Sequence, residues 1–387
     1  MADRWIILLV LFLARTAMAW QFQTIGALGP VLLDAFQLDF VWLGALIGLY
    51  LLPGAAFALP GGLLAQRYGA KNVVLAGLLA MAIGGALTAA DSFPLVAGGR
   101  LLSGMGAVAI NVVMTRMVTD WFAGREIITA MSIFVASWPL GLALGLVAFP
   151  SLAAATSWSA VMAVAAAAAL ICLALVALVY RHVPGMPAGA GPAFQIGMTA
   201  REWLLISLGG LVWTTYNAGY IILISFLPEF FMARGYSLVE AGRLVSLLGW
   251  VLIPLIPLAG YAAERLDRPN LLMVGGFGIV ALAAAALPFA AAPAAVFGVV
   301  VVGIGLPAGL IMALPAQALR PESRSVGMGV FYTFYYAGMA LLPALAGLAR
   351  DLTGSAAVTT LFAAAMMAIA LLALVGFRIA QQALRAS

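Results

Sequence analysis

Charged side chains are scarce in this sequence. Asp, Glu, Lys and Arg make up 8% of its 387 residues, whereas 65% of the residues are hydrophobic. A soluble domain carries far more charge on its surface, so this composition excludes a soluble enzyme or a soluble binding module. The apolar residues lie in runs that can cross a bilayer, which takes about 20 residues for each helix. The sequence predicts an all-α, multi-pass integral membrane protein, and we place it in a bacterial cytoplasmic membrane.

Cysteine and histidine are almost absent, with one residue of each, Cys172 and His182. A single cysteine excludes a disulfide within the chain and argues against a structural metal. The sequence also holds no nucleotide-binding loop, no cluster of metal ligands and no catalytic triad. We therefore expect no metal, no cofactor and no chemistry on a solute. The basic residues are spread among short loops, so no nucleic-acid partner is expected either.

Apolar runs suited to crossing the bilayer occur twelve times, at residues 5–33, 42–64, 73–91, 94–119, 128–149, 157–180, 203–231, 239–262, 270–290, 293–315, 326–347 and 356–380. Between the sixth and seventh runs lies a stretch rich in Pro and Gly, which is typical of a linker. The sequence predicts a six-helix bundle over residues 1–180, a cytoplasmic linker over 181–201 and a second six-helix bundle over 202–387.

The basic residues indicate how the chain is oriented, because cytoplasmic loops carry an excess of Lys and Arg. With a cytoplasmic N-terminus, the other side holds only Arg234, Arg243 and Arg350. The cytoplasmic side then carries thirteen of the eighteen basic residues: Arg4, Arg67, Lys71, Arg116, Arg125, Arg181, Arg201, Arg265, Arg268, Arg320, Arg324, Arg378 and Arg385. We expect both termini in the cytoplasm.

A short motif occurs once in each predicted half. The segment 62–71 (GLLAQRYGAK) follows the second run, and the segment 260–268 (GYAAERLDR) follows the eighth. The two segments start 198 residues apart, at 62 and 260, which is about half of the chain. Two parallel six-helix repeats are typical of one group of secondary transporters.

These segments resemble the signature G-x-L-a-D-R-x-G-R-K of the major facilitator superfamily, with Gln66 and Ala70 as departures from it. Two further segments resemble family patterns: residues 100–107 (RLLSGMGA), and residues 137–145 (SWPLGLALG), where Trp138 replaces the glycine of the antiporter element. The first run, with Leu13-Ala14-Arg15 and later Gly29-Pro30, resembles the cyanate-permease and nitroimidazole-transporter group. The resemblance implies a monomer with two pseudo-symmetric six-helix bundles. It also implies a cytoplasmic gate, for which the candidate residues are Gly62, Arg67, Gly69, Lys71, Asp120, Glu264, Arg265 and Arg268.

Arg15 lies near the middle of the first apolar run, where a charge costs at least ~2.5 kcal/mol and usually faces a polar cavity. The alternative is a structural arginine neutralised by backbone carbonyls or by an acid on a neighbouring helix. The sequence shows no membrane-embedded Asp or Glu that could be this acid. We therefore favour a role in binding.

In the family that the sequence resembles, the first, fourth, seventh and tenth helices line a central cavity. Polar and aromatic residues on the first, fourth and seventh runs are therefore candidates for substrate binding: Arg15, Gln23, Arg100, Asn111, Trp213, Tyr216, Asn217 and Tyr220. Arg100 lies nearer the outer end and has a structural alternative. A stripe of Tyr332, Tyr335 and Tyr336 stays outside this set, because the resemblance implies that the eleventh helix lines the cavity only in part.

These observations predict a secondary transporter that moves a small organic carboxylate or inorganic oxyanion by alternating access, with Arg15 as the partner of the substrate charge. A co-transported proton or a counter-transported anion is the expected coupling partner. The alternative is a multidrug or neutral-metabolite exporter in which Arg15 is structural. A membrane receptor or enzyme is disfavoured, because no extra domain or catalytic cluster is present.

Overall fold

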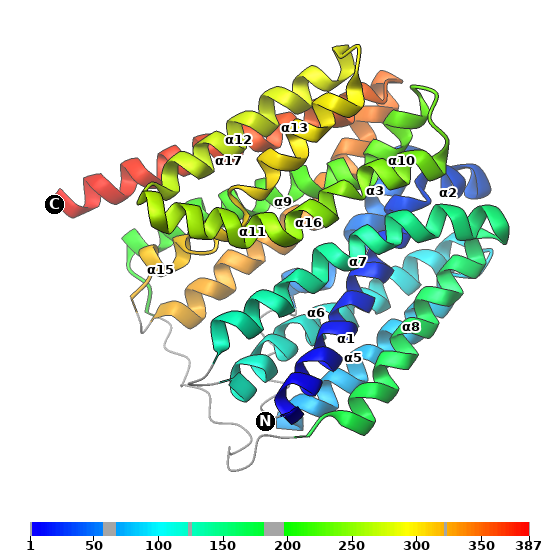
Figure 1. Ribbon diagram of the computed structural model, residues 1–387, viewed down its shortest axis with the longest axis horizontal. Helices are drawn as coiled ribbons and strands as arrows, with labels where there is room; N and C mark the ends of the chain where they lie inside the picture. The colour runs from blue at the N-terminus through cyan, green and yellow to red at the C-terminus, as the bar shows by residue number, and fades with distance from the viewer. Residues whose placement is uncertain (1, 57–66, 123–125, 182–196, 321–322, 387) are drawn as a thin grey trace.

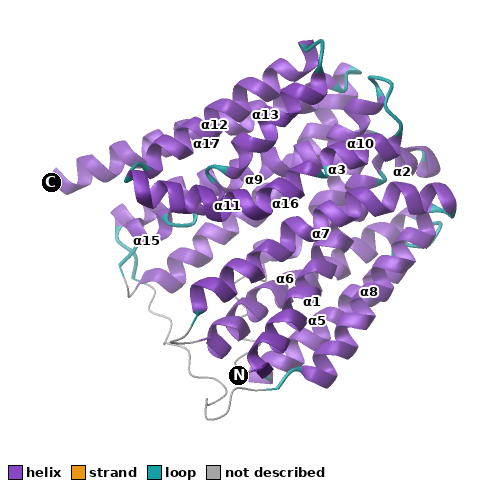
Figure 2. Ribbon diagram, in the orientation of Figure 1, coloured by secondary structure: helices purple, strands orange, loops and turns teal. Residues whose placement is uncertain are grey.

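The computed structural model describes residues 2–56, 67–122, 126–181, 197–320 and 323–386. Within these ranges every regular element is a helix, which confirms the prediction of an all-α protein (Figure 2). The helices before the predicted linker are α1 (Ala2–Ala27), α2 (Gly29–Phe36), α3 (Phe40–Leu49), α5 (Ala70–Leu87), α6 (Phe93–Phe122), α7 (Ile127–Ala155) and α8 (Trp158–Val179).

The helices after the predicted linker are α9 (Ala200–Met232), α10 (Leu238–Val245), α11 (Leu247–Leu266), α12 (Pro269–Ala286), η1 (Leu287–Phe289), α13 (Pro293–Gly305), α14 (Ala308–Ile311), α15 (Leu314–Ala318), α16 (Arg324–Thr353) and α17 (Ala357–Ala386). The α9 helix begins at a capping box, in which Thr199 and Glu202 each bind the backbone N–H of the other. Such a box satisfies N–H groups that have no partner within the helix.

Eleven of the described helices are long and apolar enough to cross a membrane, or twelve if α2 and α3 form one span bent by 115°. This agrees with the predicted twelve-helix membrane fold. The first predicted run, 5–33, corresponds to α1 and α2, which are separated by a break at Leu28. The second, 42–64, overlaps α3, and its residues 57–64 lie outside the described ranges.

The helices gather in two groups (Figure 1). We call α1 to α8 the N-half and α9 to α17 the C-half. Both chain termini lie toward one end of the molecule, which we call the termini end, and α2 and α10 lie toward the opposite end (Figure 1). Most of the predicted linker falls outside the described residues, so the boundaries at 180 and 202 stay a prediction.

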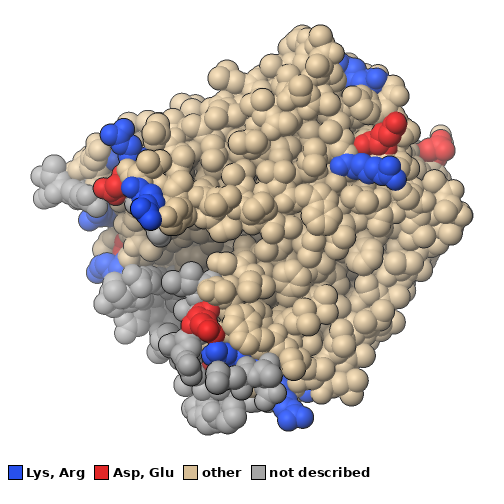
Figure 3. Space-filling model, in the orientation of Figure 1, with Lys and Arg blue, Asp and Glu red and all other residues tan. Residues whose placement is uncertain are grey.

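On the surface, charged side chains gather toward the ends of the molecule (Figure 3). On the face in Figure 3 the Lys, Arg, Asp and Glu residues cluster toward the two ends, and the broad surface between them carries none. Leucines such as Leu178, Leu282 and Leu372 are strongly exposed on the helices. A wide apolar belt between two charged rims is what a bilayer requires of a protein that crosses it. The chain is an integral, multi-pass membrane protein.

At the opposite end the two halves pack backbone against backbone, through α3 and α16. A Cβ atom added at Gly48 would lie 2.2 Å from the carbonyl oxygen of Ala340, and one at Gly347 would lie 2.0 Å from that of Phe40. No side chain larger than hydrogen fits at these two positions without moving a helix. Small residues allow this close approach of helices in membranes.

An acidic side chain holds the same contact together. The Asp351 carboxylate, at the end of α16, accepts hydrogen bonds from the backbone N–H groups of Phe40 (2.8 Å) and Val41 (2.7 Å) at the start of α3. Asp39, the residue before α3, makes no capping bond of its own. Asp351 therefore caps a helix of the other half, where the helix dipole also favours a negative charge.

Replacing Gly48 with leucine tests this packing. We expect Gly48→Leu to destabilise the protein by about 1–3 kcal/mol, the usual cost of overpacking, because the neighbour is a backbone carbonyl that cannot rotate away. Gly98→Leu on α6 is the matched control, since a Cβ there would meet nothing within 4 Å. The measurement is the thermal unfolding of the purified protein in detergent. Equal melting temperatures for the two variants would contradict the tight α3–α16 contact.

Candidate substrate cavity between the two halves

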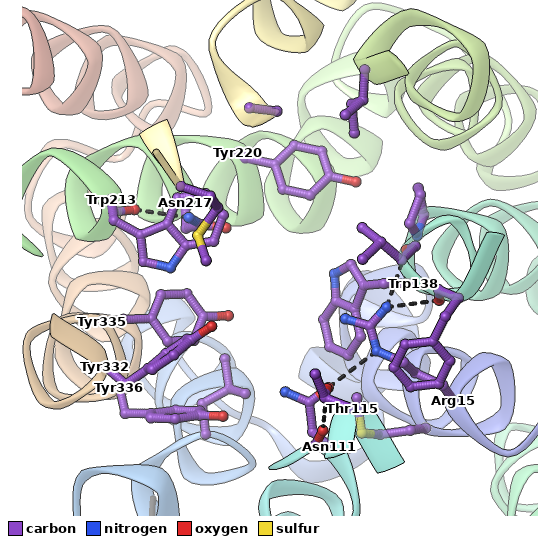
Figure 4. Close-up of a pocket in the computed structure, with 18 of the residues that line it drawn as sticks. Arg15, Asn111, Thr115, Trp138, Trp213, Asn217, Tyr220, Tyr332, Tyr335 and Tyr336 are labelled. Carbon is purple, nitrogen blue, oxygen red and sulfur yellow. Dashed lines mark hydrogen bonds between the residues drawn. The ribbon is translucent and has the colours of Figure 1, made fainter. Parts of the chain in front are cut away.

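A cavity of about 380 Å³ lies between the halves (Figure 4). Its polar and aromatic lining comes from α1, α6, α7 and the end of α3 on one side and from α9 and α16 on the other: Arg15, Tyr50, Asn111, Thr115, Phe134, Trp138, Trp213, Tyr216, Asn217, Tyr220, Tyr332, Tyr335 and Tyr336. Arg15 is the only charged residue among the described residues that line it. The volume falls within the range of small-molecule binding sites.

Arg15 is held by neutral oxygen atoms. Its Nε donates to Oδ1 of Asn111 (3.1 Å), and its Nη1 donates to the carbonyl oxygens of Phe134 (3.0 Å) and Val135 (3.1 Å). The Ser137 hydroxyl lies 3.4 Å from the same Nη1. None of the ion pairs among the described residues involves Arg15. Its positive charge is therefore hydrogen-bonded but not neutralised by a carboxylate.

A proline explains why a helix offers a carbonyl to Arg15. Pro139 lies inside α7 and has no N–H, so the carbonyl four residues earlier, that of Val135, loses its partner within the helix. Arg15 donates to this freed carbonyl from α1. A membrane protein has to satisfy such a group internally, and here the arginine satisfies it. The Ser137-Trp138-Pro139 segment thus builds the support for Arg15.

The support leaves part of the guanidinium for a ligand. Nη2 of Arg15 makes no hydrogen bond to any described residue, and it points into the cavity (Figure 4). Asn111 uses its Oδ1 for Arg15, so its amide N–H groups face the same space (Figure 4), where the Asn111 side chain also hydrogen-bonds Tyr336 of α16. Two sets of N–H donors and one positive charge therefore converge on the N-half side. Such a group binds an oxyanion well.

Four aromatic residues lie together on the other side of the cavity. Tyr332, Tyr335 and Tyr336 lie on α16 with Trp213 of α9 beside them, and we call these four residues the aromatic wall. The ring centroids of Tyr335 and Tyr336 are 4.9 Å apart, and those of Trp213 and Tyr335 are 6.0 Å apart. The tyrosine hydroxyls point across the cavity toward the side that holds Arg15 (Figure 4).

Some polar side-chain atoms of α9 are hydrogen-bonded within the protein and others have no partner. The Tyr216 hydroxyl donates to the carbonyl of Ile304 (2.7 Å), and Nδ2 of Asn217 donates to the carbonyl of Trp213 (2.8 Å). In contrast, Nε1 of Trp213 and the Tyr220 hydroxyl are buried and have no partner among the described residues. Buried polar groups are usually paired, so these two are candidates for contact with a bound solute.

The structure brings six of the eight predicted binding residues to the cavity: Arg15, Asn111, Trp213, Tyr216, Asn217 and Tyr220. Gln23 and Arg100 lie elsewhere. Nε2 of Gln23 lies 3.5 Å from the carbonyl oxygen of Ile224, four residues before Pro228 of α9, and so links α1 to the C-half.

Arg100 is fully buried and makes three backbone contacts. It donates to the carbonyls of Leu46 (3.0 Å), Gln21 (3.1 Å) and Phe22 (3.3 Å), and its guanidinium lies 4.5 Å from the ring centre of Tyr50. These contacts tie α6 to α1 and α3. Arg100 therefore lies in a structural position, as the alternative for this residue predicts, and does not line the cavity.

Several residues of the lining are not among the predicted binding residues. They include the stripe of Tyr332, Tyr335 and Tyr336, and Trp138 of the SWPLGLALG segment. The close spacing of the three tyrosines is the feature of the sequence that indicates a place in the lining. Three hydroxyls within five residues of one apolar run need water, a partner or a ligand.

The predicted gating residues make contacts only within their own half. Lys71 donates to the carbonyls of Ala177 (2.8 Å) and Tyr180 (2.9 Å) at the end of α8, and Asp120 pairs with Arg116 at 3.6 Å. Arg67 and Arg265 lie against the neighbouring rings of Tyr68 and Tyr261. Gly69 and Arg268 precede α5 and α12, and their carbonyls accept hydrogen bonds from Val73 and Leu271 of those helices. Gly62 and the Glu264 side chain lie outside the described residues.

Among the described residues, no ion pair joins the two halves at the termini end. Each of the four ion pairs among the described residues lies within one half: Arg4–Glu126, Arg116–Asp120, Arg320–Glu202 and Arg350–Glu229. Figure 3 shows a hollow between the halves at this end. The described residues also contain no group of three side chains that could hold a metal ion.

Comparison with known proteins identifies the family. The sequence matches the Major Facilitator Superfamily over residues 7–343 and 217–384. The chain belongs to this superfamily. Its members are transporters and not enzymes, as the sequence predicted.

Among its relatives, the cyanate transport protein CynX of Escherichia coli is 28% identical over 375 residues, which cover 90% of this chain and 91% of CynX. The hexuronate transporter of Bacillus subtilis is 22% identical over 269 residues, 65% of this chain and 62% of that protein. The MFS-type transporter ppz2 of Metarhizium majus is 27% identical over 51% of this chain and 36% of its own length. The chain thus spans less than two thirds of the last two relatives.

Solved structures agree on the fold. A bacterial homologue of the human lysosomal transporter Spinster, in an inward-facing and occupied conformation, superimposes with a TM-score of 0.76. The match covers 99% of this chain and 97% of the homologue at 18% sequence identity. At this identity the similarity establishes the fold alone.

The role of Pro139 in holding Arg15 can be tested directly. Pro139→Ala restores a backbone N–H that competes for the Val135 carbonyl, so Arg15 loses a charged hydrogen bond worth about 1.5–3 kcal/mol. We expect phenylglyoxal to modify Arg15 roughly tenfold faster in this variant, measured by mass spectrometry. Pro254→Ala, at a proline on the exposed side of α11, is the control. Unchanged reactivity of Arg15 in Pro139→Ala would contradict the assignment.

Proposed function

We propose that this chain is a secondary transporter that moves a small anion across a bacterial cytoplasmic membrane by alternating access, with Arg15 as the partner of the substrate charge. The observation that carries the proposal is that Arg15 is the only charged residue among the described residues of the cavity lining. Two of its relatives are named for cyanate and for hexuronate, which are anions.

The chemistry of the guanidinium supports an oxyanion or a carboxylate as the bound group. Arg15 keeps Nη2 for a ligand, and the Asn111 amide lies beside it. A planar guanidinium donates directed N–H groups to two oxygens of one ligand, which a lysine ammonium does less well. A charge that lacks a carboxylate partner in a poorly hydrated cavity attracts an anion strongly.

The arrangement of the halves supports alternating access. The halves meet tightly at the opposite end, through Gly48, Gly347 and Asp351, and a hollow separates them at the termini end. With the termini in the cytoplasm, as the basic residues predict, this conformation opens the cavity inward. Rocking of the halves about a midplane site would then open it to the other side.

The residues that line the cavity limit how transport can be coupled. The described lining has no Asp, Glu or His that could carry a proton at neutral pH. A proton would therefore have to travel on the substrate, or the transporter would exchange one anion for another. Uptake measured with and without a pH gradient, and with anions preloaded inside the vesicles, distinguishes these two couplings.

The second candidate function is an exporter of neutral or apolar solutes in which Arg15 is structural. The hydrogen bonds from Arg15 to the Phe134 and Val135 carbonyls favour it, because they would serve a structural arginine equally well. The two functions differ in one respect. Only the anion transporter depends on the charge of Arg15 for binding the solute.

Removing that charge is the decisive test of the proposed function. In proteoliposomes we expect Arg15→Gln to lower the uptake of labelled anions at least tenfold, since a hydrogen bond to a charged group contributes about 1.5–3 kcal/mol. Arg15→Lys keeps the charge but loses the planar donors, so it should retain part of the activity. Arg201→Gln, at an exposed position of the termini end, is the matched control. Anion uptake that survives Arg15→Gln in folded protein would favour the exporter.

Asp351 provides a separate test of alternating access. Asp351→Asn removes the negative cap of α3, and a cap of this kind contributes about 0.5–2 kcal/mol. We expect the variant to populate more of the conformation that is open at the opposite end, about fivefold more for 1 kcal/mol. Distances between spin labels on α3 and α16 measure this change. Asp91→Asn, an exposed acid of the loop between α5 and α6, is the control and should leave the distances unchanged.

A further inference from the structure

The cavity is much larger than a compact inorganic anion. Its volume is about 380 Å³, and a water molecule takes up ~30 Å³ of liquid, so an ion of a few atoms would leave most of the space to water. Nine of the lining residues are aromatic, and most of the others are aliphatic. Such a wall contributes little to the binding of a small hydrated ion, whereas it contributes strongly to the binding of a flat apolar body.

The distribution of charge limits the substrate further. Arg15 lies on the N-half side, and the aromatic wall of Trp213, Tyr332, Tyr335 and Tyr336 lies across the cavity from it (Figure 4). One positive charge matches one carboxylate. A second carboxylate would be placed against tyrosine rings without a cation, which is costly in a poorly hydrated site.

The unpaired donors indicate a further polar group on the substrate. Nε1 of Trp213 is buried without a partner, and an indole N–H can only donate. The buried Tyr220 hydroxyl is also unpaired among the described residues. Both come from α9 of the C-half, but Trp213 lies across the cavity from Arg15, whereas the Tyr220 hydroxyl points toward the Arg15 side (Figure 4). A solute that carries an acceptor oxygen at the end remote from its carboxylate would satisfy Trp213.

We propose that the substrate is an aromatic monocarboxylate with a polar ring substituent. Its carboxylate binds Nη2 of Arg15 and the Asn111 amide, its ring lies against the aromatic wall, and the ring substituent accepts a hydrogen bond from Trp213. This inference rests on the proposed function, because it presupposes that Arg15 binds an anion. It goes further in excluding inorganic anions and dicarboxylates as the preferred substrates.

The first experiment compares probes on the purified wild-type protein by isothermal titration calorimetry. The probes are 4-hydroxybenzoate, benzoate, cyclohexanecarboxylate, acetate, cyanate, phthalate and the uncharged benzamide. We expect 4-hydroxybenzoate to bind most tightly, and benzoate to bind roughly threefold to tenfold more tightly than cyclohexanecarboxylate, which has a similar size but no aromatic face. Acetate, cyanate and phthalate should bind at least tenfold more weakly than benzoate.

Variants assign these preferences to the two sides of the cavity. Tyr335→Leu should reduce the preference for benzoate over cyclohexanecarboxylate, and Tyr335→Phe, which keeps the ring, should preserve it. Trp213→Phe should reduce the preference for 4-hydroxybenzoate over benzoate, because the ring remains and the donor is lost. Tyr261→Leu, at an exposed tyrosine of α11, is the control and should change neither ratio. Thermal unfolding without ligand confirms that each variant is folded.

The outcomes separate this inference from the proposed function. If cyanate, acetate or phthalate binds as tightly as benzoate and Arg15→Gln abolishes the binding, the aromatic substrate is wrong and the anion transporter stands. If benzamide binds as tightly as benzoate and Arg15→Gln changes neither, both proposals are wrong. Preference for aromatic monocarboxylates together with loss of their binding in Arg15→Gln supports both.

Discussion

A charge inside a membrane protein has to be held by polar groups, and in this chain those groups are carbonyls and an amide in place of a carboxylate. The carbonyl of Val135 is available because Pro139 has no N–H to bond it, so a proline on α7 determines where the arginine of α1 lies. Because Arg15 is supported without being neutralised, the cavity keeps a positive charge on one side. The proposed binding of an anion, and with it the proposed choice of substrate, depends on this arrangement.

α1 makes a second contact in which a polar side chain lies against a carbonyl four residues before a proline. Gln23 approaches the carbonyl of Ile224, four residues before Pro228 in α9. The contact of Arg15 with Val135 joins two helices of the N-half, whereas the contact of Gln23 with Ile224 joins the two halves. Prolines inside membrane helices thus leave carbonyl oxygens without a helical partner, and polar side chains of a neighbouring helix donate hydrogen bonds to them. The close contacts at Gly48 and Gly347 and the hydrogen bonds of Asp351 also join the two halves, at the opposite end.

Much of the fold follows from the sequence, because long apolar runs, basic loops and a repeated motif are local signals. The importance of Arg15 is local as well, since a charge in the middle of an apolar run needs no structure to be noticed. The contacts of Arg100 could not be predicted, because they join α6 to carbonyls of α1 and α3 that lie 54 to 79 residues away in the chain. Tyr332, Tyr335 and Tyr336 were missed for a related reason. Which side of α16 faces the cavity depends on how the two halves meet.

The single charge of the cavity lining has an energetic consequence for the proposed cycle. An empty cavity carries the positive charge of Arg15, whereas a cavity that holds a monoanion is neutral. Reorientation of the loaded transporter then moves no net charge through the membrane field, and the return of the empty transporter moves one. Moving a full charge across the membrane involves about 2.3 kcal/mol per 100 mV, and Arg15 experiences a fraction of this. The membrane potential, negative inside, would therefore favour the empty transporter with its cavity facing the cytoplasm, and it would act on net uptake while leaving anion exchange unaffected.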